Sequence, residues 1–227
     1  MSGAHLRPRD DLAFCRLDGG MIFLDVRNDV YFRISPRLER AFNASIEGTP
    51  CIEADAGSLI SRGLLVEEPA MAAPSSVAVA PTRSAVEEPH GPQELRLQDV
   101  LETLWITGSM RFQMRVRKLH QILRALEDFR RTHAPISQGN IDKQRELSLR
   151  SAAHAFLRAR RYAPVETRCL LDSLAMTRYL ARRGHHVRIV FGVTEDPFAA
   201  HCWVQAGDLL LSDAIGNVET YTPIWTF

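Results

Sequence analysis

The stretch from Thr167 to Asp213 constrains the fold of this chain more than any other part of its sequence. It begins with TRCLLDSLAMTRYLARRG, which predicts a helix with Thr167 as N-cap and Gly184 at its end. The apolar residues surround this helix, and a helix that is apolar nearly all round is a buried one. Cys169 therefore lies in the first turn of a central helix, where the positive end of the helix dipole favours a thiolate.

Two strands are expected after this helix. The run VRIVFGV is rich in β-branched residues, and the next segment alternates so that His201 and Cys202 point to opposite faces. With a hairpin turn centred on Gly207, His201 and Asp213 are direct cross-strand neighbours, about 4.5–5.5 Å apart at Cβ. A shift of one residue in register breaks that pairing, and the sequence leaves the register open. A thiol, an imidazole and a carboxylate in this arrangement suit a nucleophile, its base and the group that orients the base.

The motifs CLLDSLAMTRYLARRG and FAAHCWVQ, together with Asp213, resemble the lasso-peptide leader peptidases, which are transglutaminase-like cysteine proteases. This resemblance covers roughly residues 93–227. It implies Cys169 as nucleophile, His201 as base and Asp213 as orienting carboxylate, with no cofactor. In that family the segment around the histidine usually reads AHAWVE, whereas this chain has Cys202 and Gln205 in it. A zinc site that uses both cysteines is disfavoured, because His201 and Cys202 point to opposite faces of the strand.

Residues 1–68 predict a separate small domain. The segments DLAFCRL, MIFLDVR and VYFRIS read as three strands joined by turn-prone residues, and PRLERAFNASI reads as a helix capped by Ser35. The segment IEADAGSLISRGLLVEE predicts one or two further short helices. Three strands followed by three helices make a winged-helix-like module, which resembles the RiPP recognition element, the fold of the peptide chaperone of pyrroloquinoline quinone synthesis.

In that family, a leader peptide adds a strand to the sheet at the third strand and packs against the last helix. Main-chain hydrogen bonds supply affinity in such β-augmentation, and side-chain pockets supply selectivity. The resemblance implies leader contacts at Asp29, Val30, Tyr31, Phe32, Arg33, Ile34, Ser58, Leu59 and Arg62. The alternative is that Tyr31 and Phe32 are ordinary residues of a half-buried strand. With 8 basic and 11 acidic residues, this segment has no basic footprint for nucleic acid.

Residues 69–91 are rich in proline, alanine and serine and predict a flexible linker. Residues 92–227 then form the predicted peptidase, with helices in its first half and an antiparallel sheet in its second. The whole chain is thus expected to be α+β, a winged-helix-like domain linked to a papain- or transglutaminase-like domain. Residues 111–161 hold 13 basic and 4 acidic side chains, which indicates either a solvated face or a dock for an acidic partner.

The composition is that of a globular protein, with 45% hydrophobic residues and a formal net charge of +1. No apolar run suggests a membrane span or a signal peptide, and the four cysteines lack paired spacing, so the expected location is a reducing cytoplasm. The resemblance to the lasso-peptide leader peptidases implies that the protein is a leader peptidase of lasso-peptide maturation. Its expected partners are the precursor's leader and an asparagine-synthetase-like lasso cyclase. A papain-like acyl transferase and a non-catalytic leader-binding protein are the alternatives.

Overall fold

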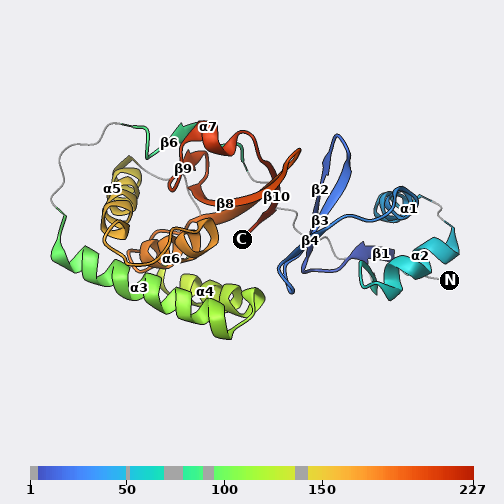
Figure 1. The fold of residues 1–227 in the computed structure, drawn as a ribbon, viewed down its shortest axis with the longest axis horizontal. Coiled ribbons are helices and arrows are strands. Elements are labelled where there is room, and N and C mark those ends of the chain that lie inside the picture. The colour runs from blue at the N-terminus through green and yellow to red at the C-terminus, as the bar shows by residue number, and fades with distance from the viewer. Residues whose placement is uncertain (1–4, 50–51, 69–78, 89–94, 136–142) are drawn as a thin grey trace. The chain divides into compact units, whose positions relative to one another are not determined.

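The computed structural model describes residues 5–49, 52–68, 79–88, 95–135 and 143–227 of the chain. These residues fall into two compact units, Met1–Ser76 and Val77–Phe227. Together they contain seven α-helices and ten β-strands, so the mixed α+β class is confirmed for the described residues. Figure 1 shows the elements of each unit with the labels used below.

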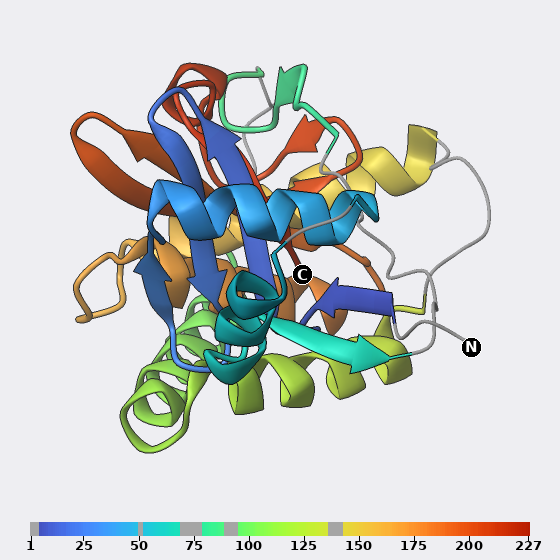
Figure 2. The same cartoon turned by 90° about the vertical axis from the view of Figure 1, so that its right-hand side faces the viewer.

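The first unit is built around a three-stranded antiparallel sheet in the order β2-β3-β4, as the sequence predicts. Its elements are β1 (His5–Pro8), β2 (Leu12–Leu17), β3 (Gly20–Asp25), β4 (Val30–Phe32), α1 (Pro36–Glu47), α2 (Glu53–Ser61) and β5 (Leu65–Glu68). Helix α1 crosses one face of the sheet (Figure 2), where Phe42 meets Phe23 edge to face at 5.0 Å between ring centroids. Both rings are fully buried, and an aromatic pair of this kind adds to the burial of its apolar area.

The chain makes α1 where its local signals predict. Ser35 caps the helix by accepting a hydrogen bond from the Leu38 backbone N–H, and Gly48 ends it in the left-handed conformation. The predicted third helix is wrong, however. Gly63, with φ 67°, follows the end of α2, and residues 65–68 form strand β5, which pairs antiparallel with β1. A partner strand far away in the sequence thus decides the conformation of this short apolar segment.

The second unit places a helical half against a five-stranded sheet in the order β10-β7-β8-β9-β6. Its elements are β6 (Arg83–Ser84), α3 (Leu97–Val116), α4 (Leu119–His133), α5 (Lys143–Arg160), α6 (Cys169–Ala181), β7 (Arg188–Glu195), β8 (Phe198–Ala206), β9 (Leu209–Leu210), α7 (Ile215–Val218) and β10 (Thr222–Thr226). Helix α6 packs against β7 and β8 and also against α3, α4 and α5 (Figure 1). Its predicted central position is therefore confirmed.

Part of the predicted linker belongs to this second unit. Strand β6 pairs in parallel with β9, and the backbone N–H of Ala85 donates to Leu210 O at 2.8 Å. Ala85 is fully buried, and Arg83 bridges Glu146 and Asp208. Residues 79–88 are therefore a correction to the linker of residues 69–91. The proline-rich composition gives no sign of the two-residue strand β6, because the strand that pairs with β6 lies more than a hundred residues away in the sequence. Residues 69–78 and 89–91 of that prediction lie outside the described residues.

Within the residues that the structure describes, no helix has both the length and the apolar character needed to cross a bilayer.

Candidate active site

The Cys169 side chain projects from the first residue of α6, where the sequence predicts it. The predicted cap is wrong: Arg168 occupies the N-cap position, and no side chain caps the helix there. Arg160 of α5 holds the loop before the helix instead. Its Nε donates to Asp172 Oδ1 at 2.6 Å, and its terminal nitrogens donate to Val165 O and Glu166 O at 3.1–3.2 Å. The buried guanidinium therefore ties α5, the loop and the first turn of α6 together.

His201 and Asp213 form the predicted pair, with His201 Nε2 and Asp213 Oδ2 2.7 Å apart. The predicted register is wrong by one residue. Gln205 pairs with Leu210 rather than with Leu209, so the turn is shorter than expected and His201 does not face Asp213 across a ladder. Strand β9 ends at Leu210, and the bends after it bring the Asp213 carboxylate to the imidazole. The contact depends on this irregular segment rather than on cross-strand pairing.

Several groups fix the Asp213 side chain and backbone. Its Oδ1 accepts hydrogen bonds from the Ala214 backbone N–H at 2.9 Å and from Asn217 Nδ2 at 2.7 Å. The Ser84 hydroxyl donates to the backbone carbonyl of Asp213 at 2.7 Å. Burial pushes the pKa of Asp213 upward, but the hydrogen bonds from His201, Asn217 and Ala214 outweigh this and lower the pKa. Asp213 is therefore a carboxylate at neutral pH.

The thiol and the imidazole shift each other's pKa in opposite directions. Hydrogen bonds from the Cys202 thiol and from His201 lower the pKa of Cys169 to about 4. The hydrogen bond to Asp213, and then that to Cys169, raises the pKa of His201 to about 9. Since Nε2 contacts Asp213, Nδ1 is the ring nitrogen left to meet the thiol. Between these two values the pair is a thiolate and an imidazolium.

Cys202 is closer to this chemistry than the sequence predicts. It does point away from Asp213, toward α6, where Ser173 Oγ donates to Cys202 O at 3.3 Å. Its thiol nevertheless reaches both Ser173 Oγ, at 3.7 Å, and the sulfur of Cys169. One S–H proton serves only one acceptor, and a thiolate accepts more strongly than a hydroxyl. Residues on opposite faces of β8 can both meet Cys169, because Cys169 lies at the tip of its helix.

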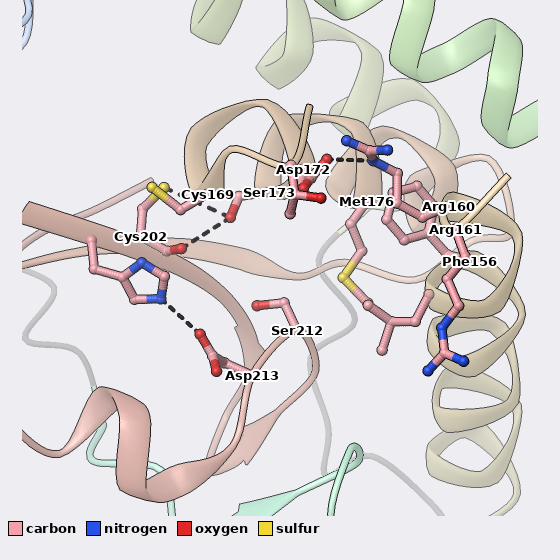
Figure 3. Close-up of a pocket in the computed structure, with 13 residues that line it drawn as sticks. Phe156, Arg160, Arg161, Cys169, Asp172, Ser173, Met176, Cys202, Ser212 and Asp213 are labelled. Carbon is pink, nitrogen blue, oxygen red and sulfur yellow. Dashed lines mark hydrogen bonds and ion pairs between the residues drawn. The ribbon is translucent and has the colours of Figure 1, made fainter. Parts of the chain in front are cut away.

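These side chains line a pocket of about 340 Å³, within the range of small ligand sites. Cys169, Cys202 and Asp213 gather at one end of it, and Phe156, Met176 and Arg161 lie at the other (Figure 3). Arg160 and Ser212 are members of the site that sequence reasoning missed, and Cys202 is a member that it placed on the opposite face of the strand. Within the described residues, no group of three or more His, Cys, Asp or Glu side chains is arranged to hold a metal ion.

Two aromatic rings surround the imidazole on the β8 side. The ring centroids of Tyr221 and Trp203 lie 5.3 Å and 6.1 Å from that of His201. Gly192 of β7 pairs with His201, and a Cβ there would lie 2.7 Å from the Trp203 ring and 2.9 Å from Tyr221 Cβ. Only glycine allows this close approach, so Gly192 sets the packing of the rings around the base.

The predicted leader-binding residues lie in the first unit, around strand β4. This strand is at one end of its sheet, and no described strand lies beyond it. Val30 is exposed, while Phe32 stacks on Phe23 at 5.4 Å between centroids and Ile34 packs on the same core. Asp29 adopts a left-handed conformation before the strand, with φ 56°. A strand at the edge of the described sheet suits β-augmentation, whereas Phe32 and Ile34 also serve the core.

The α2 part of this prediction needs one correction. Leu59 is fully buried in the core of the first unit, so its side chain is not available to a peptide. Ser58 is half-buried and Arg62 is exposed, and both remain candidates for contact. In the β4 part of the prediction, the Arg33 guanidinium donates to Gly19 O at 3.0 Å, and the half-buried Tyr31 pairs with Leu24. Around the buried Leu59, only neighbouring residues such as Ser58 and Arg62 therefore expose their side chains to solvent.

Comparison with known proteins agrees with the geometry of the second unit. The family profile described as the transglutaminase-like superfamily matches residues 109–226, which include Cys169, His201 and Asp213. Neither the curated proteins nor the solved structures gave a match. The profile covers just over half of the chain, and the cysteine at the start of α6 and the histidine on β8 both lie within it. The chain belongs to the transglutaminase-like superfamily.

Proposed function

We propose that this protein is a cysteine peptidase that binds the leader of a ribosomally made precursor peptide and cleaves it from the core. The observation that carries the proposal is the gathering of Cys169, His201 and Asp213 in one pocket, with His201 Nε2 and Asp213 Oδ2 2.7 Å apart. The pKa shifts of Cys169 and His201 favour a thiolate and an imidazolium there. Membership of the transglutaminase-like superfamily is consistent with thiol chemistry on an acyl group. Resemblance to the lasso-peptide leader peptidases supports a peptide substrate.

In the proposed reaction, the Cys169 sulfur bonds to the carbonyl carbon of the scissile peptide. The Cys169 backbone N–H at the start of α6 helps to hold the resulting oxyanion. His201 then gives its proton to the leaving amine as the C–N bond breaks, and a water hydrolyses the thioester. Asp213 keeps the proton of Nε2 in place throughout, so that Nδ1 faces the reacting atoms.

The first unit is proposed to hold the leader while the second cuts. Strand β4 lies at the edge of its sheet among the described strands, and this position supports β-augmentation by an extended leader, with the exposed side chains of Val30 and Arg62 as accessible contacts. Because one chain carries both units, leader binding raises the effective concentration of the scissile bond at Cys169. This arrangement predicts that free leader peptide competes with the precursor and inhibits its cleavage.

The released core peptide has a new amino terminus, which an asparagine-synthetase-like lasso cyclase is proposed to use for macrolactam formation. Association with that cyclase, and a cytoplasmic location, belong to the same proposal. A reducing compartment suits the site, because Cys15, Cys169 and Cys202 carry thiols rather than disulfides. No cofactor takes part in the proposed steps.

Mass spectrometry of a leader-bearing precursor, incubated with wild-type protein, Cys169→Ala and Cys202→Ala, tests the proposal. We expect wild type and Cys202→Ala to release leader and core with the addition of one water, and Cys169→Ala to release neither. Cleavage by Cys169→Ala would contradict the mechanism. Product carrying an added amine in place of water would identify an acyl transferase. Tight precursor binding without any cleavage would identify a leader-binding protein.

A further inference from the structure

Helix α3 presents large apolar side chains to solvent along its whole length. They lie on one face, are between 58% and 74% exposed, and comprise Leu97, Leu101, Trp105, Phe112 and Val116. The helix lies on the outside of the helical layer of the second unit (Figure 1). Over 20 residues it is about 30 Å long, so this outer stripe extends across the whole layer. Contiguous apolar surface of this kind marks an interaction site more often than a solvated face.

The opposite face of α3 already serves the core. Thr103, Ile106, Thr107 and Met110 are buried there, and the helix packs against α5 and α6. The face of α3 that is buried in the unit is therefore the more polar one, and the exposed face carries the larger apolar side chains. The surface helix of a globular unit normally turns its apolar stripe toward the core and its polar side chains toward solvent. Something outside the described fold of this unit is thus expected to cover the stripe.

The spacing of the stripe indicates what covers it. The apolar positions are symmetric about the midpoint between Ile106 and Thr107. In an antiparallel pair of α3 helices related by a twofold axis there, Leu97 of each copy lies opposite Val116 of the other, and Leu101 lies opposite Phe112. A closed twofold interface requires a surface that is complementary to itself in this sense.

Gly108 supports the same arrangement. It lies in the stripe, at the position opposite Trp105 in the antiparallel pair. Among the described residues a Cβ at Gly108 would meet nothing within 4 Å, so the packing of α3 in its own unit does not require glycine there. Glycine inside a helix costs about 1 kcal/mol relative to alanine. Packing of the Trp105 indole of a second copy against Gly108 would account for the glycine, because the missing side chain leaves room for the large ring between the two helix backbones.

We propose that the outer face of α3 binds a second copy of this chain, as an antiparallel helix pair with Trp105 of each copy against Gly108 of the other. Five side chains of this size bury roughly 500 Å² per chain, which is at the lower end of specific interfaces. The dissociation constant is therefore expected to be on the order of micromolar. The inference is independent of the chemistry proposed for Cys169.

The composition of the stripe predicts how salt acts on this dimer. The five large side chains that meet in this register are uncharged, so the contact between the copies is apolar. Salt screens charges, while apolar contact persists. Raising the salt concentration should therefore leave the dimer intact or strengthen it. An acidic partner held by the basic residues of this region would be released by salt instead.

Sedimentation equilibrium of the full chain, from about 1 to about 100 µM, tests the proposal. We expect the mass to rise with concentration toward twice the 25.6 kDa of one chain. Trp105→Arg should abolish this rise, and the matched control Leu147→Arg, on the exposed face of α5, should not. A mass that stays at one chain over the whole range would overturn the proposal, as would release of the dimer by salt.

Two further variants test the register and do not depend on the behaviour of Trp105→Arg. Gly108→Leu should raise the thermal stability of the monomer, because leucine favours helix, yet weaken dimerisation at least tenfold. Gly108→Cys lies beside the proposed axis and should form a covalent dimer on mild oxidation. Gln98→Cys, about 25 Å from its counterpart along the pair, should not. Unchanged dimerisation in Gly108→Leu, or equal cross-linking of the two cysteine variants, would overturn this antiparallel pairing.

Discussion

The candidate site has two walls, the start of α6 with Cys169 and strand β8 with His201, and different kinds of contact position them. On the α6 wall, a cysteine follows directly from its place as the first residue of a buried helix. On the β8 wall, the histidine depends on Asp213, and Asp213 depends on bends after a two-residue strand and on Ser84, far away in the sequence. One wall is therefore set by local helix signals and the other by long-range pairing. Each wall can be perturbed without touching the other.

The largest effect is expected from the β8 wall, in Asp213→Asn. The Asn217 amide and the Ala214 N–H both donate to Oδ1, so the variant's carbonyl oxygen should stay there and its NH₂ should face His201. Nε2 would then accept from that NH₂, so the ring would stay neutral and could not form the imidazolium that pairs with the Cys169 thiolate. We expect turnover to fall by about 10²–10⁴-fold with little loss of stability. Wild-type turnover would remove Asp213 from the mechanism.

On the α6 wall, Arg160→Met should lower both activity and stability. It leaves the Asp172 carboxylate and the carbonyl oxygens of Val165 and Glu166 without their buried partner. Loss of one member of such a pair costs about 3–5 kcal/mol, and a shift of the loop before Cys169 should lower turnover by about 10²-fold. Urea unfolding and cleavage rates measure the two effects.

The matched control for that variant is Arg168→Met, whose partner Glu166 forms only an exposed ion pair. An exposed pair contributes about 0–1 kcal/mol, so both its stability and its turnover should remain near those of wild type. Equal losses in the two arginine variants would show that the buried guanidinium has no special part in placing Cys169.

Cys202→Ala tests the contact between the two walls. It removes the hydrogen bond that contributes most to the low pKa of Cys169, but leaves those from His201 and the Cys202 backbone N–H. The pKa of Cys169 should rise, so the acidic limb of the pH–rate profile should move to higher pH. Turnover near neutral pH should change by less than about tenfold, because the thiolate still predominates there. A loss as complete as in Cys169→Ala would make Cys202 the nucleophile.

The smallest effect on turnover is expected from Gln205→Glu, beyond the β8 wall. The buried amide donates to Val79 O at 2.9 Å and to Gly207 O at 3.0 Å. A carboxylate would face both carbonyls, so stability at pH 7 should fall by about 1–3 kcal/mol. The folded state should raise the pKa of this carboxyl, so the loss should shrink as the pH falls toward its unfolded value, about 4.3. Equal stability of the variant and wild type at both pH values would contradict this role for the amide.

The sequence predicts the local parts of this molecule well and the long-range parts less well. Helix α6, strands β7 and β8, and the cap at Ser35 follow from spacing and residue type. The register at Gly207 was wrong by one residue because two turn lengths fit the same letters. The contact of His201 with Asp213 is present despite that error, since the bends after Leu210 provide what the ladder does not.

The remaining errors share one physical cause, which is a partner distant in sequence. Strand β5 forms because β1 lies beside it, and β6 forms because β9 does. Arg160 reads as one of many basic residues in its region, and only burial beside Asp172 shows its role. No local pattern could have indicated these contacts without an observed fold. The exposed stripe of α3 could not be predicted for a related reason. Periodicity predicts the helix, but it does not tell which face of the helix the rest of the chain covers.

The central claim is that Cys169 is a thiolate paired with the imidazolium of His201. Alkylation of Cys169 by iodoacetamide, followed by mass spectrometry across pH in wild type and His201→Ala, tests it most directly. A thiol whose folded pKa is lowered stays ionised until the pH falls through that value. In wild type the rate should therefore persist down to about pH 4, and in His201→Ala it should fall at a higher pH. A wild-type rate that follows an ordinary thiol, with a pKa of about 8.5 and no change in His201→Ala, would contradict the account.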